Sequence, residues 1–106
     1  MDDPTQYGLK PHIIENIQKV FESFSEVEKV ILYGSRAKGN YRTGSDIDLT
    51  IIGTDIDLSK LNEIELSLDD LMMPYTFDVS LMSHISNEGL LDHIKRVGKD
   101  FYIKSN

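Results

Sequence analysis

The sequence predicts a single small α/β domain, in which a mixed β-sheet carries helices mainly on one side. The chain has 106 residues, enough for one hydrophobic core with little room for a second domain. Apolar residues recur at helical spacing in three segments, and three short β-rich segments alternate with them. In chain order these are residues 11–24, 29–33, 46–52, 58–71, 75–81 and 88–97.

The first helix and strand follow a lead-in of ten residues without periodicity, which we expect to be loose. Pro11 suits the first turn of a helix, where a missing N–H costs little. Residues 29–33 (KVILY) are typical of a strand buried on both faces. Gly34 permits a sharp backbone turn, and Ser35 is the expected N-cap of a short helix over residues 36–38.

The second and third strands share one pattern. In residues 46–52 (DIDLTII) and 75–81 (YTFDVSL), polar and apolar residues alternate, so each strand has one polar and one apolar face. A helix over residues 58–71 connects them. A last helix follows, with Ser86 or Asn87 as its N-cap and Gly98 as its C-terminal stop, and we expect the tail KDFYIK to add an edge strand.

The charge distribution argues against a nucleic-acid partner. The net charge is −7, whereas affinity for a polyphosphate backbone depends on clustered Lys and Arg. Residues 29–45, however, contain four basic residues and no acidic one. A small positive region on an acidic body suits a compact anion better than a long nucleic acid.

Composition also indicates where the protein works. The chain has no cysteine, so disulfides and thiolate metal sites are excluded. No apolar run approaches the roughly 20 residues that span a bilayer, and the segment MDDPTQYGLK does not resemble a secretory signal. We therefore expect a cytoplasmic protein with no membrane association.

Three aspartates are the main candidates for a chemical site. If the second and third strands are neighbours, Asp46, Asp48 and Asp78 share one open face. At 4–7 Å and an effective dielectric near 20, each pair of carboxylates repels by roughly 2–4 kcal/mol. Divalent cations remove this repulsion, and oxygen ligands suit Mg²⁺. The alternative, that these aspartates are only the solvent side of the strands, stays open.

The segment between the first two strands is the candidate anion site. A strand, a Gly34–Ser35 turn and a helix start bring backbone N–H groups together, which favours a bound anion. Arg36, Lys38 and Arg42 add positive charge to this loop, although a merely solvated basic loop has the same composition. The three histidines do not share ligand spacing, and we expect His93 to be solvated.

Together these motifs resemble a known family. Gly34-Ser35, then ten residues, then Asp46-Ile47-Asp48 is similar to the signature of the DNA polymerase β-like nucleotidyltransferases. Asp78 in FDVS is similar to their third carboxylate. The chain length and the segment GSRAKG resemble the minimal nucleotidyltransferase (MNT) group, specifically the MntA-like antitoxins of MNT–HEPN toxin–antitoxin pairs.

The resemblance implies a small nucleotidyltransferase fold over residues 1–106 and a metal-dependent reaction. AMP would pass from ATP to a tyrosine hydroxyl of a HEPN toxin and silence that toxin. The implied catalytic and metal-binding residues, with two Mg²⁺ ions, are Asp46, Asp48 and Asp78. The implied nucleotide-binding residues are Gly34, Ser35, Arg36 and Ser45, with Arg36 placed to touch phosphate.

Two other functions remain open at this point. The protein could block a toxin by occlusion, without catalysis, or it could modify a small molecule such as an aminoglycoside. Assembly with itself or with a partner protein is also left open.

Overall fold

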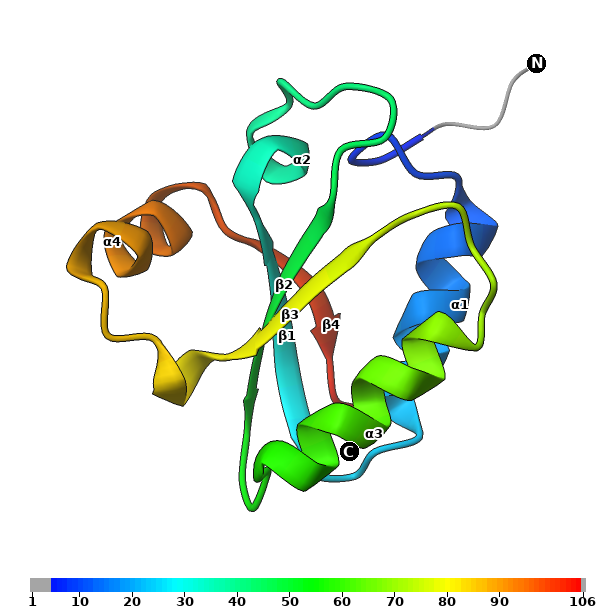
Figure 1. Ribbon diagram of the computed structural model, residues 1–106. Helices are drawn as coiled ribbons and strands as arrows, with labels where there is room; N and C mark the ends of the chain where they lie inside the picture. Colours follow the sequence, from blue (N-terminus) through cyan, green and yellow to red (C-terminus); the bar gives the residue numbers. More distant parts are fainter. Residues whose placement is uncertain (1–4, 106) are drawn as a thin grey trace.

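A four-stranded mixed sheet with the strand order β3-β2-β1-β4 is the centre of the structure (Figure 1). The computed structural model describes residues 5–105. β1 pairs antiparallel with both β2 and β4, whereas β2 and β3 are parallel. The strands are β1 (Val27–Tyr33), β2 (Ile47–Gly53), β3 (Phe77–Leu81) and β4 (Lys99–Ile103). The predicted α/β class and the additional edge strand, β4, are therefore confirmed.

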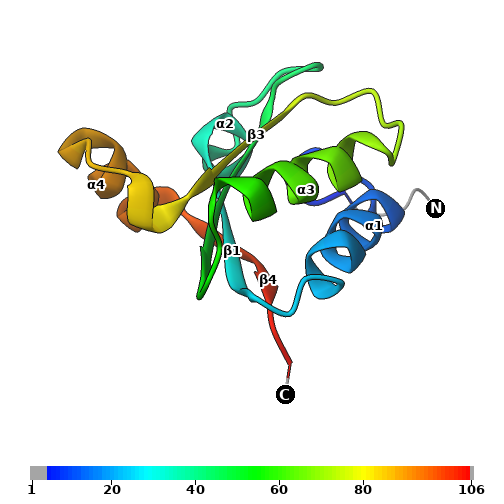
Figure 2. The ribbon, with the colours of Figure 1, turned by 60° about the horizontal axis from the view of Figure 1, so that its bottom comes forward.

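The two long helices, α1 (Pro11–Glu22) and α3 (Leu58–Asp69), lie side by side on one face of the sheet (Figures 1 and 2). The prediction that helices cover mainly one side holds for this pair. α4 (Glu88–Val97) lies on the other side and contacts β1. It follows a short 3-10 helix, η1 (Met82–His84). No helix among residues 5–105 has the length and apolar content needed to cross a membrane.

The hydrophobic core lies between the sheet and the α1–α3 layer. Alternation along β1 and β2 directs one set of apolar side chains toward that layer, and the helical stripes of α1 and α3 meet them. The core side chains from these elements are Ile17, Phe21, Val30, Leu32, Ile47, Leu49, Ile51, Ile64 and Leu68. This arrangement leaves the polar positions of β2 and β3 on the opposite face.

The lead-in is more ordered than expected. Leu9 is fully buried in the core. Gln6 and Leu9 exchange two backbone hydrogen bonds, at 3.0 and 2.9 Å. The prediction of a loose segment is therefore wrong for residues 5–10, while residues 1–4 lie outside the described part of the chain. The sequence carried no periodic signal here because Leu9 is the one fully buried residue among residues 5–10.

The helix between β1 and β2 begins earlier than predicted. α2 (Gly34–Lys38) starts at Gly34, with Tyr33 in the N-cap position and no side-chain cap. The expectation that Ser35 is the N-cap is therefore wrong. Gly34 has φ +77°, a conformation that glycine adopts without strain, and the chain passes directly from strand to helix there.

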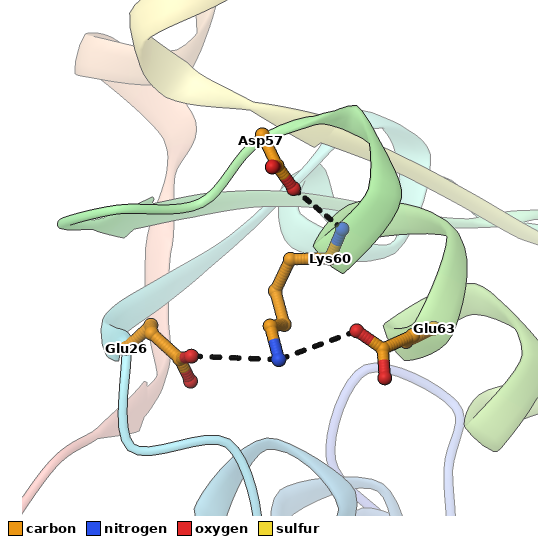
Figure 3. Close-up of polar contacts among 4 residues, drawn as sticks. All are labelled: Glu26, Asp57, Lys60 and Glu63. Atoms are coloured by element: carbon orange, nitrogen blue, oxygen red, sulfur yellow. Dashed lines mark hydrogen bonds and ion pairs between the residues drawn. The ribbon is translucent and has the colours of Figure 1, made fainter.

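Lys60 connects the start of α3 to the segment before β1 (Figure 3). Its Nζ lies 3.5 Å from Glu26 and 3.2 Å from Glu63, and its backbone N–H donates to Asp57 at 2.8 Å. Both ion pairs are open to solvent, which screens the attraction between the charges, so they add little to the stability of the fold. The Asp57 cap, which satisfies a free N–H of the first turn, fixes where α3 begins.

Candidate active site

The parallel register of β2 and β3 pairs Asp48 directly with Asp78. Neighbouring strands lie about 4.8 Å apart, so the two aspartates start from adjacent positions on the same face of the sheet. Two positions further along, Ser80 Oγ donates to Thr50 Oγ1 at 3.1 Å, and this bond connects the same two strands. The polar faces predicted for these strands are therefore one continuous surface.

Asp46 lies one residue before β2 and is exposed. Among residues 5–105, no three acidic or histidine side chains form a group that could hold a metal ion as they stand. The expected convergence of all three aspartates is therefore not preformed. The adjacent carboxylates are Asp48 and Asp78, and Asp46 lies close enough to act on Asp48 through its charge.

The environment of Asp48 disfavours its negative charge. Its pKa rises from 3.8 to about 6, first because the carboxylate is partly buried, then because of the charges of Asp78 and Asp46. The charge of Arg36 offsets part of this effect. A bound cation would favour the ionised carboxylate, so this pair of aspartates provides suitable oxygen ligands and a negative potential for Mg²⁺.

Asp48 also packs against the turn at the end of β1. A Cβ atom at Gly34 would overlap Oδ2 of Asp48. Position 34 therefore needs glycine for two reasons, a positive φ and the close approach of a carboxylate. The Gly34–Ser35 turn and the Asp48–Asp78 pair, which the sequence predicted to belong to one site, meet here.

His93, expected to be solvated, instead belongs to this turn, so that expectation is wrong. Its Nε2 accepts a hydrogen bond from the Gly34 N–H at 3.0 Å. Its ring meets the ring of Tyr33 edge-on, with the centroids 6.2 Å apart. Tyr33 is itself buried beside the carboxylates, and its pKa is raised by burial and by the charges of Asp78 and Asp48. Sequence spacing could not reveal this contact, because 59 residues separate the two partners.

Arg36 was expected to touch phosphate, but the residue is only 3% exposed and its guanidinium has other partners. Nε and Nη2 donate to the Ser45 carbonyl at 3.1 and 2.9 Å, and Nη1 donates to the Tyr7 carbonyl at 2.9 Å. The guanidinium also lies over the rings of Tyr41 and Tyr75, 5.5 and 5.2 Å from their centroids. Arg36 thus joins the lead-in, the loop before β2 and the segment before β3.

Ser45 is the point at which Arg36 holds the loop that leads to Asp46. The Ser45 carbonyl accepts from Arg36, and its hydroxyl accepts from the Arg42 N–H at 2.8 Å. Ser45 also donates its own N–H to the Arg42 carbonyl at 3.0 Å. In this structure Ser45 holds the loop through these bonds. Because its hydroxyl oxygen acts only as an acceptor here, the O–H can still donate a hydrogen bond. Lys38 and Arg42 are exposed.

The family model for the polymerase beta nucleotidyltransferase domain matches residues 15–106 of the chain. The protein belongs to this nucleotidyltransferase family. No curated protein matches the sequence. The assignment accounts for the Gly34–Ser35 turn and the Asp46–Ile47–Asp48 segment, which lie within the matched residues.

The fold of this nucleotidyltransferase is similar to that of chains in several solved toxin–antitoxin structures. A chain of a toxin–antitoxin crystallised with AMP-PNP is 20% identical, with 87% of this chain and 74% of that chain covered and a TM-score of 0.71. The MntA–HepT toxin–antitoxin is 18% identical over 90% and 74%, with a TM-score of 0.67. A complex of the tri-AMPylated Shewanella oneidensis HEPN toxin with its MNT antitoxin is 18% identical over 88% and 71%, with a TM-score of 0.66. At these identities the likeness establishes the fold.

Asp48→Asn is predicted to stabilise the metal-free protein at alkaline pH. Because the folded pKa of Asp48 lies above its unfolded value, ionisation destabilises the fold as pH rises from about 4 through 6. Allowing for solvent screening, we expect the variant to be more stable by about 1–2 kcal/mol at pH 8 and equal to wild type below pH 4. Urea unfolding in EDTA measures this, with exposed Asp69→Asn as the control. A difference that is independent of pH would contradict the assignment.

Arg36→Lys is predicted to destabilise the fold by about 2 kcal/mol, because a lysine cannot reproduce the forked hydrogen bonds or the stacking on two rings. Thermal or urea unfolding measures the change. The matched control is Arg42→Lys on the exposed part of the same loop, for which we expect no change. Full stability of Arg36→Lys combined with weaker nucleotide binding would instead support the phosphate contact.

Proposed function

We propose that the protein is a metal-dependent adenylyltransferase that transfers AMP from ATP to a tyrosine hydroxyl of a HEPN toxin and thereby acts as its antitoxin. The observation that carries the proposal is the in-register pairing of Asp48 with Asp78 beside the Gly34–Ser35 turn, in a chain of the nucleotidyltransferase family. The protein and its partner would meet in the cytoplasm.

The chemistry of three aspartates supports the metal that the proposed reaction needs. Asp46, Asp48 and Asp78 would hold two Mg²⁺ ions, and the raised pKa of Asp48 indicates a position where positive charge relieves repulsion. Asp46 is exposed and precedes the strand, so it can approach its neighbours without disturbing the sheet. When bound, Mg²⁺ neutralises triphosphate oxygens and stabilises the charge that develops during an in-line displacement.

The chain's own residues would do the remaining work. Ser35 would bind the triphosphate with its hydroxyl and backbone N–H, and the bare Cα of Gly34 would allow its close approach. The acceptor oxygen attacks the α-phosphorus, pyrophosphate leaves, and an Oδ atom of Asp78 takes the hydroxyl proton. Arg36 and Ser45 would support this site from behind by fixing the loop that carries Asp46.

The choice of partner rests on the structural neighbours. One is a complex with a HEPN toxin that carries AMP groups, and another was crystallised with AMP-PNP. The acidic body of the chain is compatible with a protein acceptor and argues against a nucleic-acid one. No nucleic acid or membrane enters the proposal.

The test is to incubate the protein with labelled ATP, Mg²⁺ and the product of the neighbouring gene, which we expect to be a HEPN toxin. We expect label on a toxin tyrosine, and we expect the Asp46→Asn, Asp48→Asn double variant to lower the rate at least about 100-fold. The matched control changes two exposed acids at the C-terminal end of α3, Asp69→Asn with Asp70→Asn, and should label normally. No labelling by the wild type, or normal labelling by the first double variant, would contradict catalysis.

A non-catalytic antitoxin is the second candidate, favoured by the lack of a preformed three-carboxylate group among residues 5–105. The Asp46→Asn, Asp48→Asn variant separates the two in cells that express the toxin. Loss of neutralisation with retained toxin binding supports catalysis. Retained neutralisation supports occlusion.

A further inference from the structure

We propose that His93 is a positioning residue, which holds the Gly34–Ser35 turn in the geometry that the triphosphate requires. The inference rests on the proposed nucleotide site, but it concerns an element, α4, that neither the family motif nor the proposed reaction assigns to that site. His93 would act through Gly34 and would not touch the substrate.

The first support is the contact itself. His93 comes from the middle of α4 and is half-buried. Its Nε2 accepts the Gly34 N–H at 3.0 Å, and its ring rests edge-on against Tyr33 at a centroid distance of 6.2 Å and an interplanar angle of 81°. Backbone and ring contacts on consecutive residues fix both the position and the orientation of the imidazole.

The second support is what Gly34 does. On one side its N–H is held by His93, and on the other its Cα lies against Oδ2 of Asp48. A shift of the turn would therefore change both the approach to the phosphates and the space available to this carboxylate. Because glycine has unusual backbone freedom, a position that must keep φ +77° gains most from an external hydrogen bond.

The third support is chemical. An imidazole nitrogen accepts a hydrogen bond only when it carries no proton, so the observed bond needs neutral His93 with its proton on Nδ1. Few side chains can replace it. Gln offers an acceptor oxygen at a similar reach, whereas Leu fills similar space and accepts nothing. This pair allows the hydrogen bond to be separated from packing.

α4 packs beside α2 on the face of the sheet opposite the core helices, where it contacts both α2 and β1. Gly98, the residue after α4, lies close to β1, because a Cβ there would overlap the Ile31 side chain as well as the Ile94 carbonyl. α4 therefore packs closely against β1. His93 extends from this helix to the turn at the end of the same strand.

The test compares His93→Leu and His93→Gln with the wild type, and uses exposed His12→Leu on α1 as the control. The dissociation constant for Mg-ATP comes from calorimetry, and the KM and kcat come from the labelling assay. Loss of one hydrogen bond should raise the dissociation constant and KM in His93→Leu by about three- to tenfold, with kcat within about twofold. His93→Gln should restore wild-type values, and His12→Leu should not differ from wild type.

Equal binding by His93→Leu and wild type, or equal loss in both His93 variants, would overturn the inference. A second measurement is independent of nucleotide. Nitrogen-15 NMR at neutral pH should show His93 with a protonated Nδ1 and a bare Nε2, and the opposite tautomer would overturn the inference even if the leucine variant fails to fold. If the wild type does not bind Mg-ATP while this tautomer is present, the proposed function fails and the structural contact stands.

Discussion

The main constraint on this structure is the repulsion between two carboxylates, Asp48 and Asp78, which lie side by side on parallel strands. Asp48 is half-buried. Like charges at this spacing repel by a few kcal/mol, and a domain of this size has only about 5–15 kcal/mol of net stability. The raised pKa of Asp48 reflects the free-energy cost of ionising a partly buried carboxyl beside other negative charges. A fold that keeps such a pair gains from a cation that neutralises it, and this links the architecture to the nucleotidyltransferase family.

The surrounding elements hold this pair in place from three directions. Gly34 meets Asp48 from the end of β1, and His93 of α4 holds Gly34 from behind. Arg36 connects the lead-in, the loop before Asp46 and the segment before β3. It donates hydrogen bonds to backbone carbonyls and lies over two aromatic rings. Meanwhile the α1–α3 layer buries the apolar face of the sheet, so the polar face is available for chemistry.

The sequence was sufficient to predict the features that follow from the periodic spacing of polar and apolar residues. Alternation along residues 46–52 and 75–81 predicted both polar faces, and helical stripes predicted the long helices. It was insufficient where one residue acts through a distant partner. Leu9 anchors the lead-in to the core and the Tyr7 carbonyl anchors it to Arg36. His93 accepts a hydrogen bond from a backbone N–H 59 residues away, and the charge of Arg36 does not predict that its side chain is buried. Ser35 is not the cap because Gly34 already enters the helix.

The most direct test of the central claim is the pKa of the Asp48 carboxyl, measured by carbon-13 NMR titration with and without Mg²⁺ and a non-hydrolysable ATP analogue. The account predicts a value of about 6 in the free protein and a fall below the ordinary value of 3.8 when metal and nucleotide are bound. A value near 3.8 in the free protein, or a value near 6 that magnesium and nucleotide leave unchanged, would contradict it.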